Sequence, residues 1–315
     1  MNAAPFISIC IPAYKRIDFL QRLLDSIAIQ TYGDYEVVIT DDSPDDSVSL
    51  FVEKYADLKS VQYIRNKKSL GTPENWNEAI RNATGKWIKL MHDDDWFADK
   101  NALQLFYDEA LKNKASSFIF CAYTNVNLAI KSNETVHLNR IAKFLLRKSP
   151  LNLFKKQFIG PPSCTLIRKD TDVFYDNKFK WVVDFEFYIR CLLKVKRFCY
   201  INQPLVNIGL NDDQVTKYSF RVPEVEIPEN QMLVEKLGFQ ILRNIFVYDY
   251  YWRFYRNLGI RDQMDVKKYF DKDLHPWLLQ MIRMQSKVSP SILRIGIFSK
   301  FLMCWSYLIS FRKNI

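Results

Sequence analysis

The chain has 315 residues, a formal net charge of +10 and an apolar share of 48%. It is long enough for one large domain or a domain with an extension, because single hydrophobic cores usually stop growing near about 250 residues. The apolar share and the lack of repeats or low-complexity segments exclude a disordered chain and a solenoid. The charge favours an anionic partner. No zinc-finger, RNA-recognition or helix-turn-helix signature accompanies it, so we expect no nucleic acid.

Six cysteines are scattered along the chain without a Cys-x-x-Cys pair, and there are only three histidines. This pattern does not indicate a zinc site, and we expect reduced, mostly buried thiols. The N-terminal residues run directly into an apolar stretch and lack the features of a secretory signal peptide. We therefore expect a cytoplasmic protein.

Strand and helix patterns alternate along the first part of the chain. Short apolar runs indicate strands, and apolar residues that recur at helical spacing indicate helices. The alternation predicts crossover connections and an α/β, doubly wound, mainly parallel sheet, whose ligands bind beyond the carboxyl ends of the strands. The expected strands are residues 6–12, 35–40, 61–64 and 86–91, and the expected helices are 18–29, 48–55 and 73–83.

The later part of the chain is less regular. We expect a turn at 160–162, a strand at 163–168 and a helix at 183–194 that complete the sheet. From about residue 222 the chain is aromatic, basic and helical in period, which predicts a helical extension. The expected division is a catalytic domain at 1–221, with halves at about 1–98 and 99–221, followed by an extension at 222–315.

Three predicted strands end in polar residues, at 13–16, 41–43 and 92–95. Asp93, Asp94 and Asp95 follow one of these strands directly, where their mutual repulsion is costly unless a cation or solvent relieves it. Hard oxygen ligands suit Mg²⁺ or Mn²⁺, which commonly bridge carboxylates to substrate phosphates. The alternative is a solvated acidic turn that caps the next helix.

A second acidic pair, Asp41 and Asp42, also follows an apolar strand. A carboxylate at this place can accept hydrogen bonds from a nucleobase or a ribose hydroxyl. The alternative is an Asx-type turn before Pro44. The pair alone does not decide between these interpretations.

Taken together, the motifs resemble the family 2 glycosyltransferases, which have the GT-A fold. The resemblance covers about residues 5–210, and the order and spacing of its motifs agree along that whole stretch. The motifs that carry it are residues 7–16, 30–32, 36–43, Asn66 with Gly71 and Asn75, 83–85, and 90–96.

The resemblance implies a nucleotide-sugar site with a divalent cation, Mn²⁺ or Mg²⁺. It implies that Asp94 is the first metal ligand, with Asp95 beside it. The family usually has an acidic residue where His92 stands and Asn where Lys15 stands. The residues implied to line the nucleotide-sugar site are Pro12, Ala13, Tyr14, Asp41, Asp42, Gly71, Asn75 and Asp93.

An inverting sugar transfer needs a base that takes the proton from the acceptor hydroxyl. Asp184 opens the predicted helix at 183–194 and resembles the family's base motif, in which an acidic residue precedes Arg; Arg190 stands there. Glu186 is the reserve candidate. The alternatives are that Asp184 is an ordinary N-cap and that Glu186 is a first-turn acid favoured by the helix dipole.

Two further segments resemble the acceptor side of the family. Residues 207–216 resemble a segment that in the family often carries a histidine near the diphosphate. In this chain Asn211 stands at that place. The other segment resembles the family's acceptor-side turn, and the alternative is a plain structural turn. It consists of Gly160, Pro161, Pro162 and Ser163.

The C-terminal segment 292–315 mixes large apolar residues with Arg and Lys. Its charge-free stretch between Lys300 and Arg312 is too short to span a bilayer. We expect an amphipathic helix on an anionic membrane surface, with Trp305 and Tyr307 at the headgroup level. Packing on the catalytic domain or on another subunit is the alternative, of equal weight.

The sequence thus predicts a metal-dependent, inverting glycosyltransferase of the hexosyltransferase type. By the resemblance, we expect a UDP-sugar donor and a lipid-linked glycan acceptor on polyprenyl diphosphate, in bacterial O-antigen, lipopolysaccharide or surface-polysaccharide synthesis. The expected place is peripheral, on the cytoplasmic face of the inner membrane. The alternatives are a nucleotidyltransferase and a non-catalytic carbohydrate- or lipid-binding module. The oligomeric state is left open.

Overall fold

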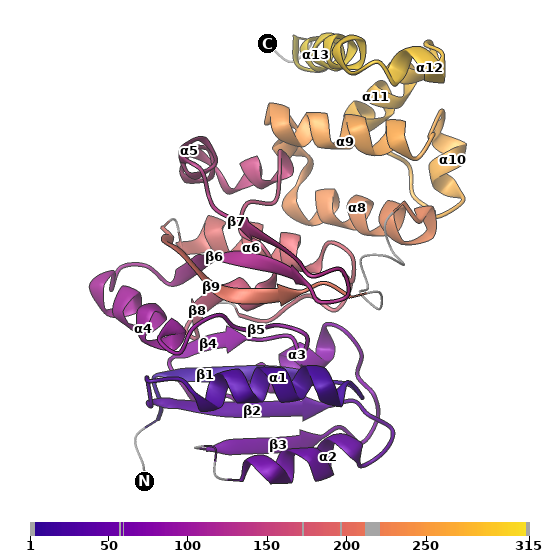
Figure 1. Cartoon of the computed structure of the whole chain (residues 1–315). Helices are drawn as coiled ribbons and strands as arrows, with labels where there is room; N and C mark the ends of the chain where they lie inside the picture. Colours follow the sequence, from indigo (N-terminus) through magenta and orange to yellow (C-terminus); the bar gives the residue numbers. More distant parts are fainter. Residues whose placement is uncertain are drawn as a thin grey trace. The chain divides into compact units, whose positions relative to one another are not determined.

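The computed structural model describes residues 4–56, 58, 60–171, 173–195, 197–211 and 221–312 (Figure 1). By its internal contacts the chain forms two units. The first comprises Met1–Arg147 and Phe158–Asp213, and the second comprises Lys148–Gln157 and Gln214–Ile315. The segment 148–157, which sequence analysis placed in the catalytic domain, therefore belongs to the second unit.

The first unit is built on a mixed β-sheet. Among the described residues, nine strands form this sheet in the order β3-β2-β1-β4-β8-β6-β9-β5, with β7 paired to β6. The strands are β1 (Ile7–Ala13), β2 (Tyr35–Asp41), β3 (Val61–Arg65), β4 (Trp87–Leu90), β5 (Trp96–Phe97), β6 (Phe118–Asn127), β7 (Ser132–Val136), β8 (Thr165–Arg168) and β9 (Cys199–Gly209).

The strands β1 to β4 are parallel, which confirms the doubly wound N-terminal half. β8 then runs antiparallel to both β4 and β6, and β6 pairs with β9 in parallel. The sheet is therefore mixed beyond β4. The structure also corrects two boundaries. The expected strand at 163–168 begins at Thr165, and the expected helix at 48–55 is α-helical only to Val52, with a 3-10 turn after it.

Helices cover both faces of this sheet (Figure 1). Leucine and isoleucine side chains of α1 and phenylalanine and leucine side chains of α4 pack in one apolar core with β1 and β2. The helices of the first unit are α1 (Ile17–Ala28), α2 (Ser47–Val52), α3 (Glu74–Asn82), α4 (Ala102–Lys112), α5 (Arg140–Lys148) and α6 (Val183–Val195), with the 3-10 helices η1 (Glu53–Tyr55) and η3 (Pro162–Cys164).

The strand β1 shows why the sheet's inner strands are almost wholly apolar. Successive side chains of a strand point to opposite faces. Ile7, Ile9 and Ile11 belong to the core that contains α1, whereas α3 contacts β1 and β2 outside that core. Because both faces of β1 are covered, the alternation of apolar and polar residues typical of a half-exposed strand is lost.

The second unit is helical in its described residues. The side chains of Tyr248, Tyr251, Trp252 and Tyr255 on α9 are almost completely buried. The polar group of each forms a hydrogen bond, as buried Tyr and Trp require. Its elements are η2 (Pro150–Phe154), α8 (Pro223–Leu237), η4 (Phe239–Arg243), α9 (Ile245–Asn257), α10 (Gln263–Lys267), α11 (Pro276–Ser286), α12 (Pro290–Leu293) and α13 (Gly296–Arg312).

The segment 148–157 joins the second unit through specific contacts. The ring of Phe154 on η2 lies edge-on to Tyr250, with centroids 5.1 Å apart. The amide of Asn244 donates to Asn152 at 2.9 Å. Within the described part of the chain, every helix falls short of the length and apolar character that crossing a bilayer would require.

A half-buried carboxylate fastens β2 to the turn that precedes β4. Glu36 accepts hydrogen bonds from the Ser8 hydroxyl at 2.6 Å, from the Thr84 hydroxyl at 2.9 Å and from the amide of Gly85 at 3.2 Å. Burial alone raises the pKa of Glu36, but these hydrogen bonds outweigh it and hold the pKa below its usual value of 4.5. The ionised form therefore stabilises the fold.

We expect the substitution Glu36→Gln to lower the free energy of unfolding by about 1–3 kcal/mol at pH 7, because an amide cannot accept all of these hydrogen bonds. The folded-state pKa is lowered, so the stabilisation is complete above about pH 4.5 and is lost as the pH falls through the folded-state value. Urea unfolding at pH 7 and at pH 3.5 measures this. The difference between wild type and variant should shrink at the lower pH. Glu53→Gln, at an exposed position, is the matched control.

Candidate active site

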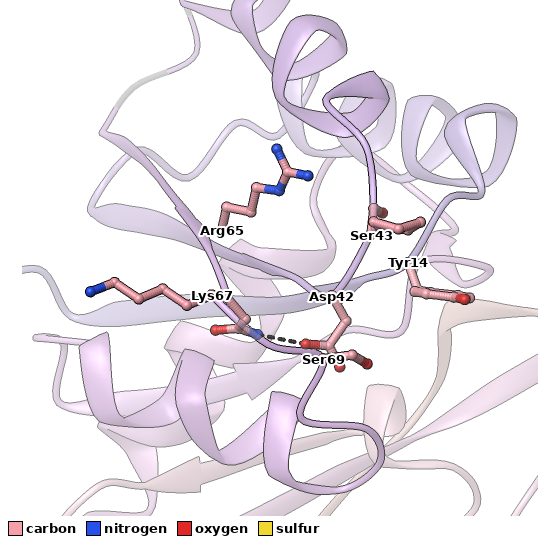
Figure 2. Close-up of a pocket in the computed structure, with 8 residues that line it drawn as sticks. Tyr14, Asp42, Ser43, Arg65, Lys67 and Ser69 are labelled. Carbon is pink, nitrogen blue, oxygen red and sulfur yellow. Dashed lines mark hydrogen bonds between the residues drawn. The ribbon is translucent and has the colours of Figure 1, made fainter.

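The carboxyl ends of β1, β2 and β3 surround a cavity of about 430 Å³ (Figure 2). In Figure 2, Tyr14 and Ser43 lie on one side of it and Arg65 and Lys67 on the other, with Asp42 and Ser69 between them. Its position agrees with the rule that ligands of open α/β sheets bind where the strands end. The lining residues are Tyr14, Asp42, Ser43, Pro44, Arg65, Asn66, Lys67 and Ser69.

Asp42 organises the loop that closes this cavity. One of its carboxylate oxygens accepts the Asn66 side-chain amide at 2.8 Å and the Leu70 backbone amide at 3.0 Å. The other oxygen accepts the Gly71 amide at 2.7 Å. Gly71 has a φ of +69°, which glycine adopts without strain. The expected pair Asp42 and Gly71 is thus brought together, and Asp42 holds the loop that faces Tyr14.

Other residues expected in the nucleotide site support the cavity wall. Asp41 is fully buried and accepts hydrogen bonds from the Ser43 amide at 2.8 Å and the Tyr63 hydroxyl at 2.7 Å, so it lies beneath the cavity and outside its lining. The Asn75 amide donates to the backbone oxygens of Ala13 and Thr40. Pro12 and Ala13 lie within β1, directly before the lining residue Tyr14.

The acidic cluster at the end of β4 includes an ion pair that sequence analysis did not anticipate. Asp93 is 3% exposed, and both of its oxygens accept hydrogen bonds from the guanidinium of Arg16, which follows β1. Burial raises the pKa of Asp93 to about 7, although Arg16 opposes this rise. Because its carboxylate binds the guanidinium group, Asp93 holds the Arg16 side chain in place.

Asp94 is the most exposed carboxylate of the three, with 13% of its side chain accessible. One oxygen accepts the Asn211 amide at 2.9 Å and lies 3.4 Å from the Arg16 guanidinium. Asp95 is buried and accepts the backbone amide of Gly209 at 3.2 Å, and burial holds its pKa well above the usual range. The structure therefore brings Asn211 and Asp94 together. Residues 212–216 of the expected diphosphate segment lie outside the described residues.

His92, Asp94 and Asp95 form a group that fits a cation. Each offers a ligand atom, and these atoms lie within 4.8 Å of one another. The Nε2 atom of His92 is buried and has no hydrogen-bond partner among the residues that the structure describes. Burial lowers the pKa of His92 to about 4, so the ring is neutral at pH 7, as a metal ligand requires. The mixture of imidazole and carboxylate ligands favours a transition ion such as Mn²⁺ over Mg²⁺, which prefers oxygen ligands.

A buried lysine supports the acidic cluster from below. Lys89 on β4 is fully buried, and its ammonium donates to the backbone oxygen of Ser163. The Ser163 hydroxyl in turn accepts the backbone amide of His92 at 3.0 Å. Burial lowers the pKa of Lys89 to about 8. Ser163 was expected on the acceptor side, but it is fully buried and supports the start of residues 92–95, which we call the acidic loop.

The two candidate bases have different surroundings. Glu186 is completely buried and forms an ion pair with Arg190 at 2.9 Å, so it has a structural partner on its own helix. Asp184 is partly exposed and lies inside the first turn of α6, one residue after the helix begins. This position corrects the N-cap alternative. Burial raises the pKa of Tyr188, and the charge of Asp184 raises it further. The pKa of Tyr175 is raised by burial, then by Cys191 and then by Asp184.

Aromatic contacts connect this region to the acidic loop. The Tyr188 hydroxyl donates to the backbone oxygen of Gly160 at 3.0 Å, in the expected acceptor-side turn. The ring of Tyr175 lies edge-on to Trp76 at 5.1 Å, and Trp76 lies 4.7 Å from His92. In that turn Gly160 and Pro162 are buried and Pro161 is partly exposed.

Sequence analysis missed the cations of the site. Arg16 stands in a motif that carried the resemblance, but its pairing with two aspartates depends on a contact between separate loops. Arg65 and Lys67 line the cavity only because β3 lies next to β2. The one local signal for Lys89 in the sequence was its position as a charged residue within a predicted apolar strand.

A sequence model described as glycosyl transferase family 2 matches residues 8–174, just over half of the chain. The chain belongs to glycosyltransferase family 2. An uncharacterized glycosyltransferase of Rickettsia felis is 34% identical over 134 residues, which are 42% of this chain and 21% of that protein. The chain thus spans about a fifth of that relative's length.

Solved structures share this family member's fold. Staphylococcus aureus TarS 1-349, in complex with UDP-GlcNAc, aligns with a TM-score of 0.66 at 17% identity and covers 96% of this chain and 89% of its own. The mannosyltransferase PcManGT of Pyrobaculum calidifontis, in complex with GDP-Man and Mn²⁺, aligns with a TM-score of 0.57 at 12% identity and covers 98% and 86%. These likenesses confirm the expected GT-A fold.

Gly209 offers a test of how the loop of Asp93, Asp94 and Asp95 is held in this family member. A Cβ at this position would overlap the backbone oxygen of Asp94, so Gly209→Ala should displace the acidic loop. We expect a loss of about 1–3 kcal/mol in the free energy of unfolding, as for overpacking elsewhere. Chemical denaturation measures it. Gly296→Ala, where a Cβ meets open space, is the matched control. Equal stabilities of the two variants would contradict the close packing of β9 on the acidic loop.

Proposed function

We propose that this protein is an inverting glycosyltransferase that transfers a sugar from a nucleotide-diphosphate donor to an acceptor hydroxyl. The observation that carries the proposal is the link between its two polar sites. Tyr14 lines the cavity after β1, and two residues later Arg16 binds Asp93 and Asp94 of the acidic cluster. A nucleoside bound in the cavity therefore has its diphosphate directed toward Arg16 and the cluster.

The donor we propose is a UDP-sugar. The cavity supplies Asp42 and Asn66 for the polar edge of a base, and the aromatic ring of Tyr14, which is 49% exposed, for its face. Lys67 adds positive charge to the cavity wall beside Arg65, which is paired with Asp46, and this charge suits an anionic nucleotide. The TarS neighbour is in complex with UDP-GlcNAc and the mannosyltransferase neighbour with GDP-Man, so UDP is the first donor to test.

The cation we propose is Mn²⁺, held by Asp94, Asp95 and His92. When bound, such an ion offsets the charge that a departing nucleoside diphosphate accumulates. Arg16 supplies a permanent positive charge beside Asp94. Asn211 holds the Asp94 carboxylate in place from the loop after β9.

The base we propose is Asp184. Its carboxylate takes the proton of the acceptor hydroxyl while the hydroxyl oxygen attacks the anomeric carbon. The bond from that carbon to the diphosphate oxygen breaks on the opposite side, and its electron pair leaves with the diphosphate. Asp184 is preferred to Glu186 because it is partly exposed, whereas Glu186 is buried and paired with Arg190.

The acceptor we propose is a lipid-linked glycan on polyprenyl diphosphate, as in bacterial O-antigen, lipopolysaccharide or other surface-polysaccharide synthesis. Such an acceptor would be met at the cytoplasmic face of the inner membrane by a peripheral protein. The basic C-terminal segment supports this setting, because positively charged helices associate with anionic lipid.

We expect Asp184→Asn to reduce sugar transfer by at least about 100-fold, the usual contribution of a positioned general base. Donor binding should stay close to that of wild type. Asp94→Asn should reduce both transfer and cation-dependent donor binding. Transfer is measured with radiolabelled donor and acceptor extract, and binding is measured by calorimetry. Asp108→Asn, on the exposed face of α4, is the control. Unchanged transfer in both site variants would refute the roles proposed for Asp184 and Asp94. Donor binding without any transfer by wild type would favour the non-catalytic binding module.

A thermal-shift screen tests the donor and the cation separately. We expect a UDP-sugar at 100 times its dissociation constant to stabilise the protein by about 2.7 kcal/mol in the presence of Mn²⁺. Removing the cation with a chelator should reduce this stabilisation, and His92→Ala should reduce the effect of Mn²⁺ specifically. Stabilisation by GDP-sugars alone would refute uracil as the nucleobase of the donor. A donor response equal with and without Mn²⁺ would refute the proposed ion.

A further inference from the structure

The helix α13 packs on the second unit through its small polar side chains. Ser299 accepts a hydrogen bond from the indole of Trp252 at 3.0 Å. Ser306 and Ser310 lie 2.8 and 3.1 Å from the hydroxyl of Tyr248. These three serines are at most 8% exposed. The face of α13 that meets the protein is therefore the face that a surface helix normally turns toward water.

The opposite face of α13 carries large apolar side chains. Ile297 is 88% exposed, Phe301 65%, Trp305 50% and Leu308 47%. These residues are four, four and three positions apart, so they form one continuous line along the helix. We call these four residues the α13 stripe. Contiguous exposed apolar surface of this kind marks an interaction site on a folded protein.

The charge around the α13 stripe identifies its partner. From residue 274 to residue 315 the sequence has six basic residues and no acidic one. Arg283, Lys287 and Arg294 are exposed, and Lys300 pairs with Asp249 at 2.8 Å. An anionic lipid surface is complementary to this charge. A second copy of the chain would bring two basic segments together, which is unfavourable.

We propose that the α13 stripe is a membrane-docking face that enters the interface of an anionic bilayer while the serine face stays packed on the second unit. Lipid binding and packing on the protein, which the sequence leaves as alternatives, then involve opposite faces of one helix. Trp305 lies in the stripe, with an indole that suits the headgroup level. The inference deepens the lipid-linked setting of the proposed function, although its test needs no transfer activity.

The test is sedimentation of the full chain with vesicles of phosphatidylglycerol and phosphatidylethanolamine at low salt. Wild type should sediment with these vesicles and should be released when high salt shortens the Debye length. The double variant Phe301→Gln/Trp305→Gln should show at least about a tenfold lower partition coefficient, because two aromatic side chains leave the interface. The matched control is Ile29→Gln/Leu50→Gln, which removes two equally exposed apolar side chains from the first unit.

Two outcomes would overturn the proposal. Equal sedimentation of the double variant and wild type would show that the stripe does not contact lipid. A wild type that ignores the vesicles but forms a dimer lost in the double variant, by analytical ultracentrifugation, would show that a second copy covers the stripe. Nucleotide binding measured on the same preparations keeps the two proposals distinct. The double variant should bind the donor as wild type does, and a donor-binding failure in wild type would count against the transferase proposal alone.

Discussion

The site depends on holding three successive carboxylates together at the end of one strand. Their mutual repulsion would separate them in water, and burial makes each charge more costly. In the structure this repulsion is offset because each of the three carboxylates has a partner of its own. Arg16 binds Asp93, Asn211 binds Asp94, and the backbone amide of Gly209 binds Asp95. The acidic loop is therefore held by segments that follow β1 and that end β9, and it exists as a site only when the sheet is complete.

The nucleotide cavity uses the same principle with neutral donors. Asp42 gathers two backbone amides and one side-chain amide, and in doing so it fixes the loop after β3. Asp41, its neighbour in sequence, is buried and is bound by Tyr63. Two adjacent aspartates thus have different tasks, because Asp41 is the last residue of β2 and lies outside the cavity lining, whereas Asp42 follows the strand and lines the cavity. One shapes the cavity and the other supports it.

In the second unit, the helix α13 differs from an ordinary surface helix in which side chains it buries. The helix α13 buries serines and exposes aromatic and aliphatic side chains, which reverses the usual arrangement of a surface helix. Serine hydroxyls can be buried there because Tyr248 and Trp252 offer partners. Close packing of small residues also lets α13 approach α9. A helix built in this way attaches to the body and still presents an apolar face.

The sequence by itself determined the N-terminal half of the sheet. Local apolar periodicity predicts β1 to β4 and their helices, and polar motifs mark the ends of the strands. It also marked Asp42, Asp94 and Asn211, whose places in family motifs do not depend on distant contacts. Only the tertiary structure decided which cation neutralises the aspartates, because Arg16 meets Asp93 across 77 positions of the chain. It alone showed that Glu186 is paired within its helix while Asp184 is partly exposed, and that α13 turns its serines inward. Local patterns fix what a segment forms, whereas burial and ion pairing depend on which segments the fold brings together.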